Sequence, residues 1–419
     1  MASSALLLPD FDRSPAPALD HALLHDAAIL GLLQSARDHL GLEAAWIARY
    51  VEDDLREITH IASEIDLPLA AGSRQDRADS WCWHALHGRL PALIADLADD
   101  PLAARLAIAA ALPAGCCLTV PLHLSDGTVW GSMTSMGCQA DPSLNQRDLN
   151  IFTSFAQMAA TRIESVLEEG IELAAARARV EAMLDGHAVT MFQQPIHALA
   201  GGRAVGVECL ARFPDLTKRG PQAWFDDAQR TGLGMALELT AVRCGLEAVG
   251  QVPDGIYAAI NASPATILSG DLRRELENCE ARDLVIEIVG HQAVEDMAAL
   301  IREVDRLRPF ARIAIDDIGT GFHGLRHLAD LQPDILKMDM LLTRDVDTDP
   351  ARRAIAAAMV QFAGDIGAKL VAQGIETAAE RQTMHDLGVD YGQGYLFARP
   401  LPVVAAQQHL MGVRMDDEE

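Results

Sequence analysis

The second half of the chain repeats one pattern, in which a short apolar run ends in a polar residue and is followed by a stretch with helical spacing. The pattern starts near residue 186 and continues to about residue 400. Strands that alternate with helices over this length favour an α/β barrel with parallel strands. Because the carboxyl ends of such strands meet at one face of a barrel, the polar run ends are expected to converge there. The runs cover residues 204–208, 255–261, 284–287, 312–317, 334–339, 369–373 and 391–397.

The polar residues at the run ends share one chemistry, since five of them carry hard oxygen donors: Glu208, Asn261, Glu287, Asp316 and Asp317. Carboxylate and amide oxygens are ligands that Mg²⁺ and Mn²⁺ prefer. The adjacent Asp316 and Asp317 could serve two ions, an arrangement common in phosphodiester hydrolysis. Lys337 would add a positive charge near a phosphate or an attacking water. Taken singly, each acid is more often a surface or capping residue, so the predicted Mg²⁺ or Mn²⁺ site depends on their joint placement.

The charge of the chain excludes several classes of partner. Its formal net charge is −26 over 419 residues, whereas nucleic acid or an anionic membrane would require a basic surface. Seven cysteines without zinc-type spacing indicate a reducing compartment. Residues 1–20 lack the basic start and the long apolar run of a signal peptide, and apolar stretches such as 106–112 are too short to span a bilayer. The sequence therefore predicts a cytoplasmic protein without a membrane span.

The first third of the chain mixes helical and strand patterns and lacks the regular alternation of the second half. Residues 1–20 are expected to be flexible, residues 21–144 to form an α+β domain, and residues 406–419 to be an acidic tail. Within the α+β domain, helices are expected at 21–39 and 81–90, strands at 44–51 and 56–63, and a hairpin at 117–124 and 128–136.

The segment 145–185 predicts one long helix that joins the two parts. Steps of three and four residues from Leu149 meet apolar side chains at nine of eleven positions, as in a heptad seam. One interpretation is a coiled coil that makes a homodimer, with Phe152 and Ile163 in the seam. The other is a helix that covers the sheet of its own domain. The sequence leaves both interpretations open.

Residues 186–405 resemble the EAL domain, the family of cyclic-di-GMP phosphodiesterases. The motif that names the family stands as Glu208-Cys209-Leu210, with Cys where Ala is usual. The resemblance implies a variant (β/α)₈ barrel, a requirement for Mg²⁺ or Mn²⁺, and frequent dimerisation. The other matching motifs are Gln194-Pro195-Ile196, Asn261-Ala262-Ser263-Pro264, Asp316-Asp317-Ile318-Gly319-Thr320-Gly321, Lys337-Met338-Asp339 and Gln393-Gly394-Tyr395.

The resemblance also implies a role for each motif residue. Arg212 would pair with a phosphate of cyclic-di-GMP, and Lys337 would act near the attacking water. Asp316 and Asp317 would hold a second metal ion. The first metal ion would be held from four strands, by Glu208, Asn261, Glu287 and Asp316. The remaining ligand-binding residues would be Leu210, Gln194 and Gln393.

Two positions depart from the family pattern. The family has a Glu, important for catalysis beside the second metal ion, where this chain has Gln373. It also has a Glu that steadies the loop after the Asp pair, where this chain has Gly290. A neutral amide cannot accept a proton from water near pH 7. Both changes affect turnover, whereas the residues implied in first-metal and phosphate binding are kept.

Residues 21–144 resemble a GAF domain, a family of sensory modules that often bind small molecules or dimerise. The resemblance rests on the order of the expected elements and on residues 88–91, 120–122 and 126–132. Several side chains could indicate haem, bilin or redox sensing: Cys82, Cys116, Cys117, His84 and His87. The alternative is that the cysteines are buried and act as small apolar residues, with both histidines on the surface.

The sequence supports three hypotheses for the function. In the first, a degenerate EAL domain binds cyclic-di-GMP with little or no hydrolysis, because Gln373 and Gly290 replace acids. In the second, the protein is an active or conditionally active phosphodiesterase that gives linear pGpG. In the third, the EAL domain works only through contacts with a protein partner, an idea that the retained Arg212, Glu208 and Lys337 argue against.

Overall fold

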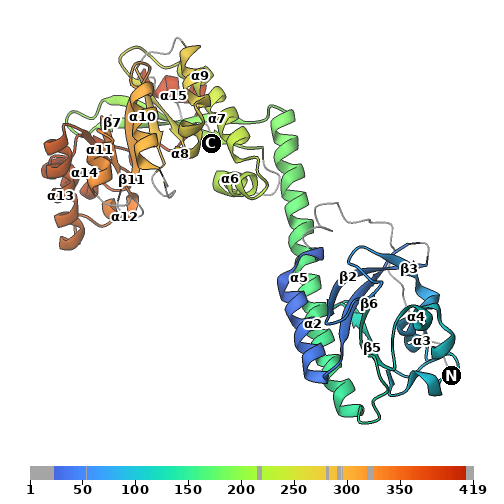
Figure 1. The fold of residues 1–419 in the computed structure, drawn as a ribbon. Helices are drawn as coiled ribbons and strands as arrows, with labels where there is room; N and C mark the ends of the chain where they lie inside the picture. The colour runs from blue at the N-terminus through green and yellow to red at the C-terminus, as the bar shows by residue number, and fades with distance from the viewer. Residues whose placement is uncertain are drawn as a thin grey trace, which may run out of the picture. The chain divides into compact units, whose positions relative to one another are not determined.

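The computed structural model describes residues 23–52, 54–214, 219–279, 283–289, 294, 296–318 and 325–411. The chain forms two compact units, Met1–Ala175 and Ala176–Glu419 (Figure 1). The expected flexible N-terminus, most of the expected acidic tail, the loop 319–321 and Gly290 lie outside the described residues. In the part of the chain that the structure describes, no helix has both the length and the apolar character needed to cross a bilayer.

The N-terminal unit is an α+β domain built on a six-stranded sheet. The strand order is β3-β2-β1-β6-β5-β4, and each neighbouring pair is antiparallel. This architecture confirms the predicted α+β class, and the predicted hairpin is the β5–β6 pair. The strands are β1 (Ala44–Tyr50), β2 (Leu55–Ser63), β3 (Arg74–Asp76), β4 (Leu93–Ile94), β5 (Cys116–His123) and β6 (Val129–Gly137).

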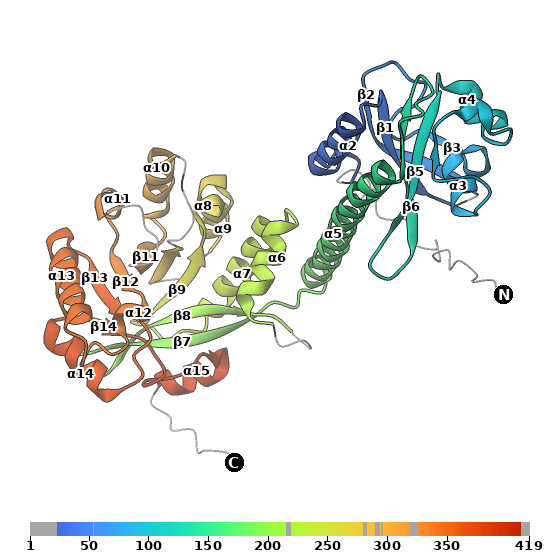
Figure 2. The ribbon, with the colours of Figure 1, turned by 90° about the horizontal axis from the view of Figure 1, so that it is seen from below.

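Helices cover both faces of this sheet (Figures 1 and 2). On one face, α2 (Ala27–Leu40) and the first half of α5 (Gln146–Asp185) pack on Ile47 of β1. On the other face, Trp46 of the same strand packs with α3 (Trp81–Leu86) and α4 (Ala107–Ala111). Successive strand residues point to opposite faces, so one apolar strand serves two cores. The short 3₁₀ turns are η1 (Arg77–Asp79), η2 (Leu97–Asp99) and η3 (Ala103–Arg105).

His84 is buried, so the expectation that it lies on the surface is wrong. Its ring is buried, and its Nε2 lies 2.9 Å from the carbonyl oxygen of Ala78. His87 is exposed, as expected. Within the described ranges, no cysteines and histidines gather as a group of three that could hold a metal ion. All three cysteines singled out from the sequence are buried: Cys82, Cys116 and Cys117.

Helix α5 is the long helix that the sequence predicted, with 40 residues. In its first half the apolar stripe faces the domain's own sheet, and Phe152 and Ile163 have no exposed surface. The interpretation of these two residues as a dimer seam is therefore wrong, because the sheet already occupies that face. A period of seven shows that a helix has an apolar stripe but does not say what covers it. In the last turns, Val180 packs near Trp224 of α6 (Pro221–Arg230).

The C-terminal unit is an α/β barrel with one reversed strand. The sheet order is β14-β13-β12-β11-β10-β9-β8-β7-β15, and an additional β14–β7 pairing closes it. Strands β8 to β14 are parallel, whereas β7 runs antiparallel to β8, β14 and β15. The predicted variant (β/α)₈ barrel is confirmed. The strands are β7 (Thr190–Ala198), β8 (Ala204–Arg212), β9 (Tyr257–Ala262), β10 (Leu284–Ile288), β11 (Arg312–Ile318), β12 (Ile335–Met338), β13 (Lys369–Ala372), β14 (Tyr391–Gly392) and β15 (Leu401–Pro402).

Helices surround this barrel (Figure 2). The strand predicted over 391–397 is shorter than expected, because the chain turns at Gly394. There the backbone passes so close to Ile375 that a side chain would not fit. Besides α6, the helices are α7 (Gly234–Val249), α8 (Pro264–Ser269), α9 (Asp271–Glu277), α10 (Met297–Leu307), α11 (Leu325–Asp330), α12 (Met340–Thr343), α13 (Pro350–Ile366), α14 (Ala378–Leu387) and α15 (Val403–Leu410).

Candidate metal and nucleotide site

Alternation along the barrel strands directs the polar run ends to the interior. An apolar layer fills the barrel below them and includes Ala259, Val285, Ala314, Ile335 and Val371. Side chains two positions apart on a strand share a face, so the next interior layer lies towards the carboxyl ends of the strands. The residues two positions after this apolar layer are Asn261, Glu287, Asp316, Lys337 and Gln373.

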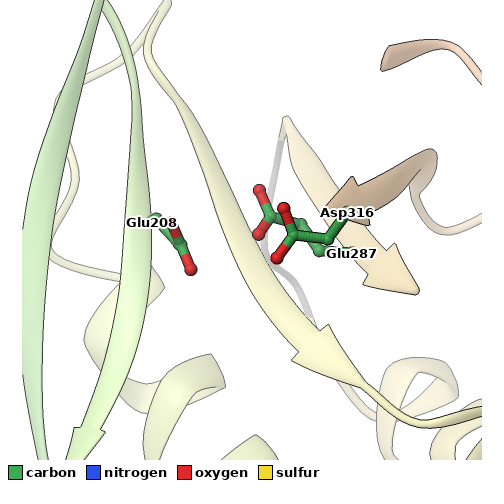
Figure 3. A group of neighbouring side chains, drawn as sticks. All are labelled: Glu208, Glu287 and Asp316. Carbon is green, nitrogen blue, oxygen red and sulfur yellow. The ribbon is translucent and has the colours of Figure 1, made fainter. Parts of the chain in front are cut away.

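The Lys337 ammonium lies among three carboxylates at the centre of this layer. Its Nζ is 2.5 Å from Glu287 Oε2, 3.0 Å from Glu208 Oε2 and 3.3 Å from Asp316 Oδ1. Figure 3 shows the three acids, which come from separate strands. Each offers an oxygen within 4.8 Å of the others. Lys337 has no exposed surface, so its charge is neutralised by these carboxylates rather than by water.

Burial and the neighbouring charges together set the ionisation of the site. Burial and repulsion from Glu208 hold the pKa of Glu287 well above its usual range, in spite of Lys337. Burial alone would lower the pKa of Lys337, but the carboxylates hold it well above its usual value. Burial would also raise the pKa of Glu208, but Lys337 and Asn261 keep it below its usual value. Because burial and the repulsion between the acids raise the pKa of Glu287, a further cation beside them would favour its ionised form.

Amide side chains fix the orientation of Glu208. Asn261 Nδ2 donates to Glu208 Oε1 at 3.0 Å, and Gln393 Nε2 donates to Glu208 Oε2 at 2.8 Å. The same Gln393 nitrogen is 3.1 Å from Gln194 Oε1. Gln194 in turn donates to the carbonyl oxygen of Ala398 at 3.1 Å. The structure therefore links both residues selected from the sequence to this carboxylate, Gln393 by direct contact and Gln194 through Gln393.

Gln373 contacts the site as a hydrogen-bond donor. It directly follows β13, and its Nε2 donates to Asp316 Oδ1 at 2.9 Å. Its Oε1 is buried and has no hydrogen-bond partner among the described residues. The amide thus places a hydrogen-bond donor against Asp316, whereas a second carboxylate at this position would repel it unless a cation lay between them.

A β-bulge separates the two adjacent aspartates. The register of β11 against β12 shifts between Ile315 and Ile318. Asp317 has a left-handed backbone with φ 54° and is half-buried. An ordinary strand would direct Asp316 and Asp317 to opposite faces, but a bulge changes the direction of one side chain. The bulge is a physical means by which two successive acids could serve one site.

Arg212 lies at the end of β8 and rests on an aromatic ring. Its guanidinium carbon is 5.3 Å from the ring centroid of Phe192, and its Nη1 donates to the carbonyl oxygen of Ala211 at 2.9 Å. Both Arg212 and Leu210 are partly exposed. The sequence interpretation missed Phe192, although it lies two residues before Gln194 on one strand and so shares its face.

The donor set fits a hard divalent cation. The carboxylates of Glu208, Glu287 and Asp316, with the amide oxygen of Asn261, supply the oxygen ligands that Mg²⁺ and Mn²⁺ prefer. Two further oxygens, Oε1 of Gln373 and of Gln393, are buried without a hydrogen-bond partner in the described part of the chain. Buried polar atoms are normally paired, so an ion or its bound water would complete this arrangement.

Comparison with known families agrees with this geometry. Residues 177–400 match the family model of the EAL domain, which is more than half of the chain. The chain belongs to the EAL domain family. Residues 25–164 match the family model of the GAF domain. The resemblance found in the motifs is thus confirmed, with the GAF domain at the N-terminus and the EAL domain at the C-terminus.

Curated relatives of the EAL domain carry enzyme names. PdeB of Escherichia coli (strain K12), named a probable cyclic di-GMP phosphodiesterase, is 30% identical over 249 residues, or 55% of this chain and 47% of PdeB. RocR of Pseudomonas aeruginosa, named a cyclic di-GMP phosphodiesterase, is 28% identical over 240 residues, or 54% of this chain and 60% of RocR. The chain therefore spans less than two thirds of either relative.

Solved structures share the fold. An EAL domain protein from Listeria monocytogenes EGD-e has a TM-score of 0.51 and 24% identity, over 55% of this chain and 95% of that protein. The EAL enzyme Bd1971 has a TM-score of 0.54 and 16% identity, over 88% of this chain and 92% of that protein. Both comparisons show a similarity of fold.

Proposed function

We propose that this protein is a cyclic-di-GMP signalling protein whose EAL domain binds cyclic-di-GMP with little or no hydrolysis. The names of the relatives PdeB and RocR support the ligand. The observation that carries the loss of hydrolysis is the contact of Gln373 Nε2 with Asp316 Oδ1 at 2.9 Å. In this proposal the GAF domain is the sensor that regulates the EAL domain.

The chemistry of an amide explains why the domain would still bind cyclic-di-GMP after it has lost the ability to hydrolyse it. Hydrolysis needs a group that accepts a proton from the attacking water, and an amide does not do so near pH 7. Gln373 also adds no negative charge beside Asp316 and Asp317, so a second metal ion would be held weakly. Phosphate binding depends on Arg212, which is present.

We propose Mg²⁺ or Mn²⁺ as the cofactor, held by Glu208, Asn261, Glu287 and Asp316. When bound, the ion would supply positive charge for a phosphate oxygen of the nucleotide. Leu210, Gln194 and Gln393 would line the nucleotide site, Asp317 would be available to a second ion, and Lys337 would neutralise the acids between binding events.

The proposal is tested by measuring binding and hydrolysis on the same protein. The purified 419-residue protein with saturating Mn²⁺ is titrated with cyclic-di-GMP in a calorimeter, and the same mixture is analysed for pGpG by chromatography. We expect binding without accumulation of pGpG. Rapid formation of pGpG would contradict the loss of hydrolysis, and absence of binding would favour the protein-contact hypothesis.

The second candidate is an active or conditionally active phosphodiesterase. The specific observation in its favour is that Glu208, Glu287, Asp316 and Lys337 remain assembled in one buried cluster. Hydrolysis that appears only when the GAF domain receives its signal would support this candidate.

Arg212→Ala is expected to weaken cyclic-di-GMP binding about 10- to 150-fold, equivalent to roughly 1.5–3 kcal/mol for a hydrogen bond to a charged group. Arg212→Lys should restore little of this affinity, because an ammonium lacks the paired donors of a guanidinium. The control is Arg243→Ala on α7, which removes an arginine whose Nη2 lies 2.7 Å from Glu275 Oε1. Calorimetry that finds equal affinity for the Arg212 and Arg243 variants would remove Arg212 from the binding site.

We also propose a homodimer, through the outer surface of α5 rather than its buried stripe. Met158 and Ile171 are exposed there, Ile171 to 64%. Ile171→Glu should therefore lower the mass measured by light scattering, whereas Val404→Glu on α15, also 64% exposed, should leave it unchanged. Phe152→Asp should instead unfold the N-terminal domain, because Phe152 lies in its core. An unchanged mass for the Ile171 variant would place any dimer contact elsewhere.

A further inference from the structure

A buried arginine in the GAF domain has a thiol as a neighbour and lacks a carboxylate partner. Arg56 on β2 is 1% exposed, and none of the ion pairs found among the described residues includes it. Its Nη2 donates to Gln75 Oε1 at 2.6 Å, and its Nη1 lies 3.7 Å from Cys82 Sγ. A buried, unpaired positive charge is unfavourable. A thiolate at Cys82 would balance this charge.

Hydroxyl groups complete the surroundings of this sulfur. Ser80 Oγ lies 3.2 Å from Cys82 Sγ and also donates to the carbonyl oxygen of Arg77 at 2.6 Å. The hydroxyls of Tyr50 and Ser132 lie beside the sulfur. Three donors near it have no well-formed hydrogen bond in the described part of the chain: Arg56 Nε, Tyr50 Oη and Ser132 Oγ. These orphaned groups come from β1, β2 and β6, whereas Cys82 comes from α3.

The pKa shift of Cys82 is opposite in direction to that of five other cysteines. Burial would raise the pKa of its thiol, but the Arg56 guanidinium holds it below its usual value. Cys117, its neighbour on β5, has the opposite shift, because burial raises its pKa and no cation offsets this. Burial likewise raises the pKa of Cys116, Cys138, Cys209 and Cys244.

We propose that Cys82 is a site of oxidation by hydrogen peroxide, with Arg56, Tyr50 and Ser132 as the groups that bind the peroxide. The Cys82 thiolate attacks one peroxide oxygen, an S–O bond forms and the O–O bond breaks. The sulfur is oxidised by two electrons, and the leaving hydroxide takes the proton of the transferred oxygen, which leaves a sulfenate and water. The orphaned donors stabilise the negative charge that develops on the leaving oxygen. This site is independent of the cyclic-di-GMP proposal.

Access to the sulfur depends on local opening of the domain. Cys82 is 4% exposed. It lies in the first turn of α3, a six-residue helix whose N-cap residue, Ser80, makes no side-chain capping bond. The opening has to move this turn out of the core, where the neighbouring Trp81 is 1% exposed. Peroxide is small and polar, so a limited opening suffices.

The test is sulfenate trapping on the reduced 419-residue protein. Dimedone is added with hydrogen peroxide, and adduct formation at each cysteine is followed by mass spectrometry between pH 5 and 9. We expect Cys82 to react at least about tenfold faster than Cys117, with a rate midpoint below the ordinary thiol value of about 8.5. The charged and titratable groups that face the sulfur are Arg56, Tyr50 and Cys117.

Two variants distinguish the proposed role of Arg56 from a general effect of burial. Arg56→Met should slow the reaction at Cys82 at least about tenfold and raise its pH midpoint. Arg49→Met is the matched control, because Arg49 is also buried but pairs with Glu57 Oε2 at 2.7 Å. Circular dichroism verifies that both variants are folded.

Three results would overturn the proposal. One is equal reaction rates at Cys82 and Cys117 in the parent protein. Another is a pH midpoint at or above the ordinary thiol value. The third is a folded Arg56→Met variant with the parent rate. If Arg56→Met does not fold, the pH profile of the reaction at Cys82 in the parent protein still tests the proposal. Ser132→Ala should slow that reaction while Arg56 stays in place.

Discussion

Gln373→Glu is expected to raise the rate of cyclic-di-GMP hydrolysis by roughly 10²–10⁴, the usual contribution of a well-placed general base. The new carboxylate would stand where the Gln373 amide now contacts Asp316. Because two adjacent carboxylates repel each other, the gain should require Mg²⁺ or Mn²⁺. The measurement is the single-turnover rate of hydrolysis by the parent and the variant, with and without the metal.

Another amide of the same site provides the matched control. Gln393→Glu also introduces a carboxylate, but next to Glu208 rather than Asp316, so it should not increase hydrolysis. Gln373→Glu combined with Gly290→Glu should exceed the single variant if Gly290 is where the family's loop-steadying acid is missing. A parent protein that already hydrolyses rapidly, or a Gln373 variant that stays inactive with bound metal and nucleotide, would show that position 373 does not limit turnover.

Lys337→Met is expected to destabilise the metal-free barrel by about 3–5 kcal/mol, because it leaves buried carboxylates without their counter-ion. Lys337 is fully buried and lies within 3.3 Å of three acids. Mg²⁺ or Mn²⁺ should restore part of the stability, since the ion replaces the lost positive charge. Urea-dependent hydrogen exchange on peptides from β10 and β11 reports on the barrel alone, with and without EDTA.

Lys369→Met is the control for this experiment. Lys369 lies on β13, and its Nζ is 2.7 Å from Asp390 Oδ1, but its side chain is 57% exposed. Exposed pairs contribute about 0.2–1 kcal/mol, so this variant should stay close to the parent and should not respond to metal. If both lysine variants behave alike, the acids at the centre of the barrel do not depend on Lys337.

The sequence predicted which acids would lie together at the barrel mouth because the rule that places them is local. Alternation along a strand fixes the face of each side chain, and a barrel brings the strand ends together. Asn261, Glu287 and Asp316 could therefore be selected from one sequence. The family motifs added Gln194 and Gln393, which the alternation rule by itself did not select. The helix at 145–185 was predicted for the same local reason, a stripe of apolar residues.

Only the tertiary structure decided which side chains contact each other when they lie far apart in the sequence. The sequence placed Lys337 near a phosphate or a water, but the barrel places its ammonium against three carboxylates, 129 residues from Glu208 in the chain. The stripe of α5 was compatible with a second chain or with its own sheet, and packing assigned Phe152 to the sheet. Likewise, composition gave no sign that Arg56 would meet Cys82. Spacing determines the direction of a side chain, whereas its partner depends on which strands and helices the fold brings together.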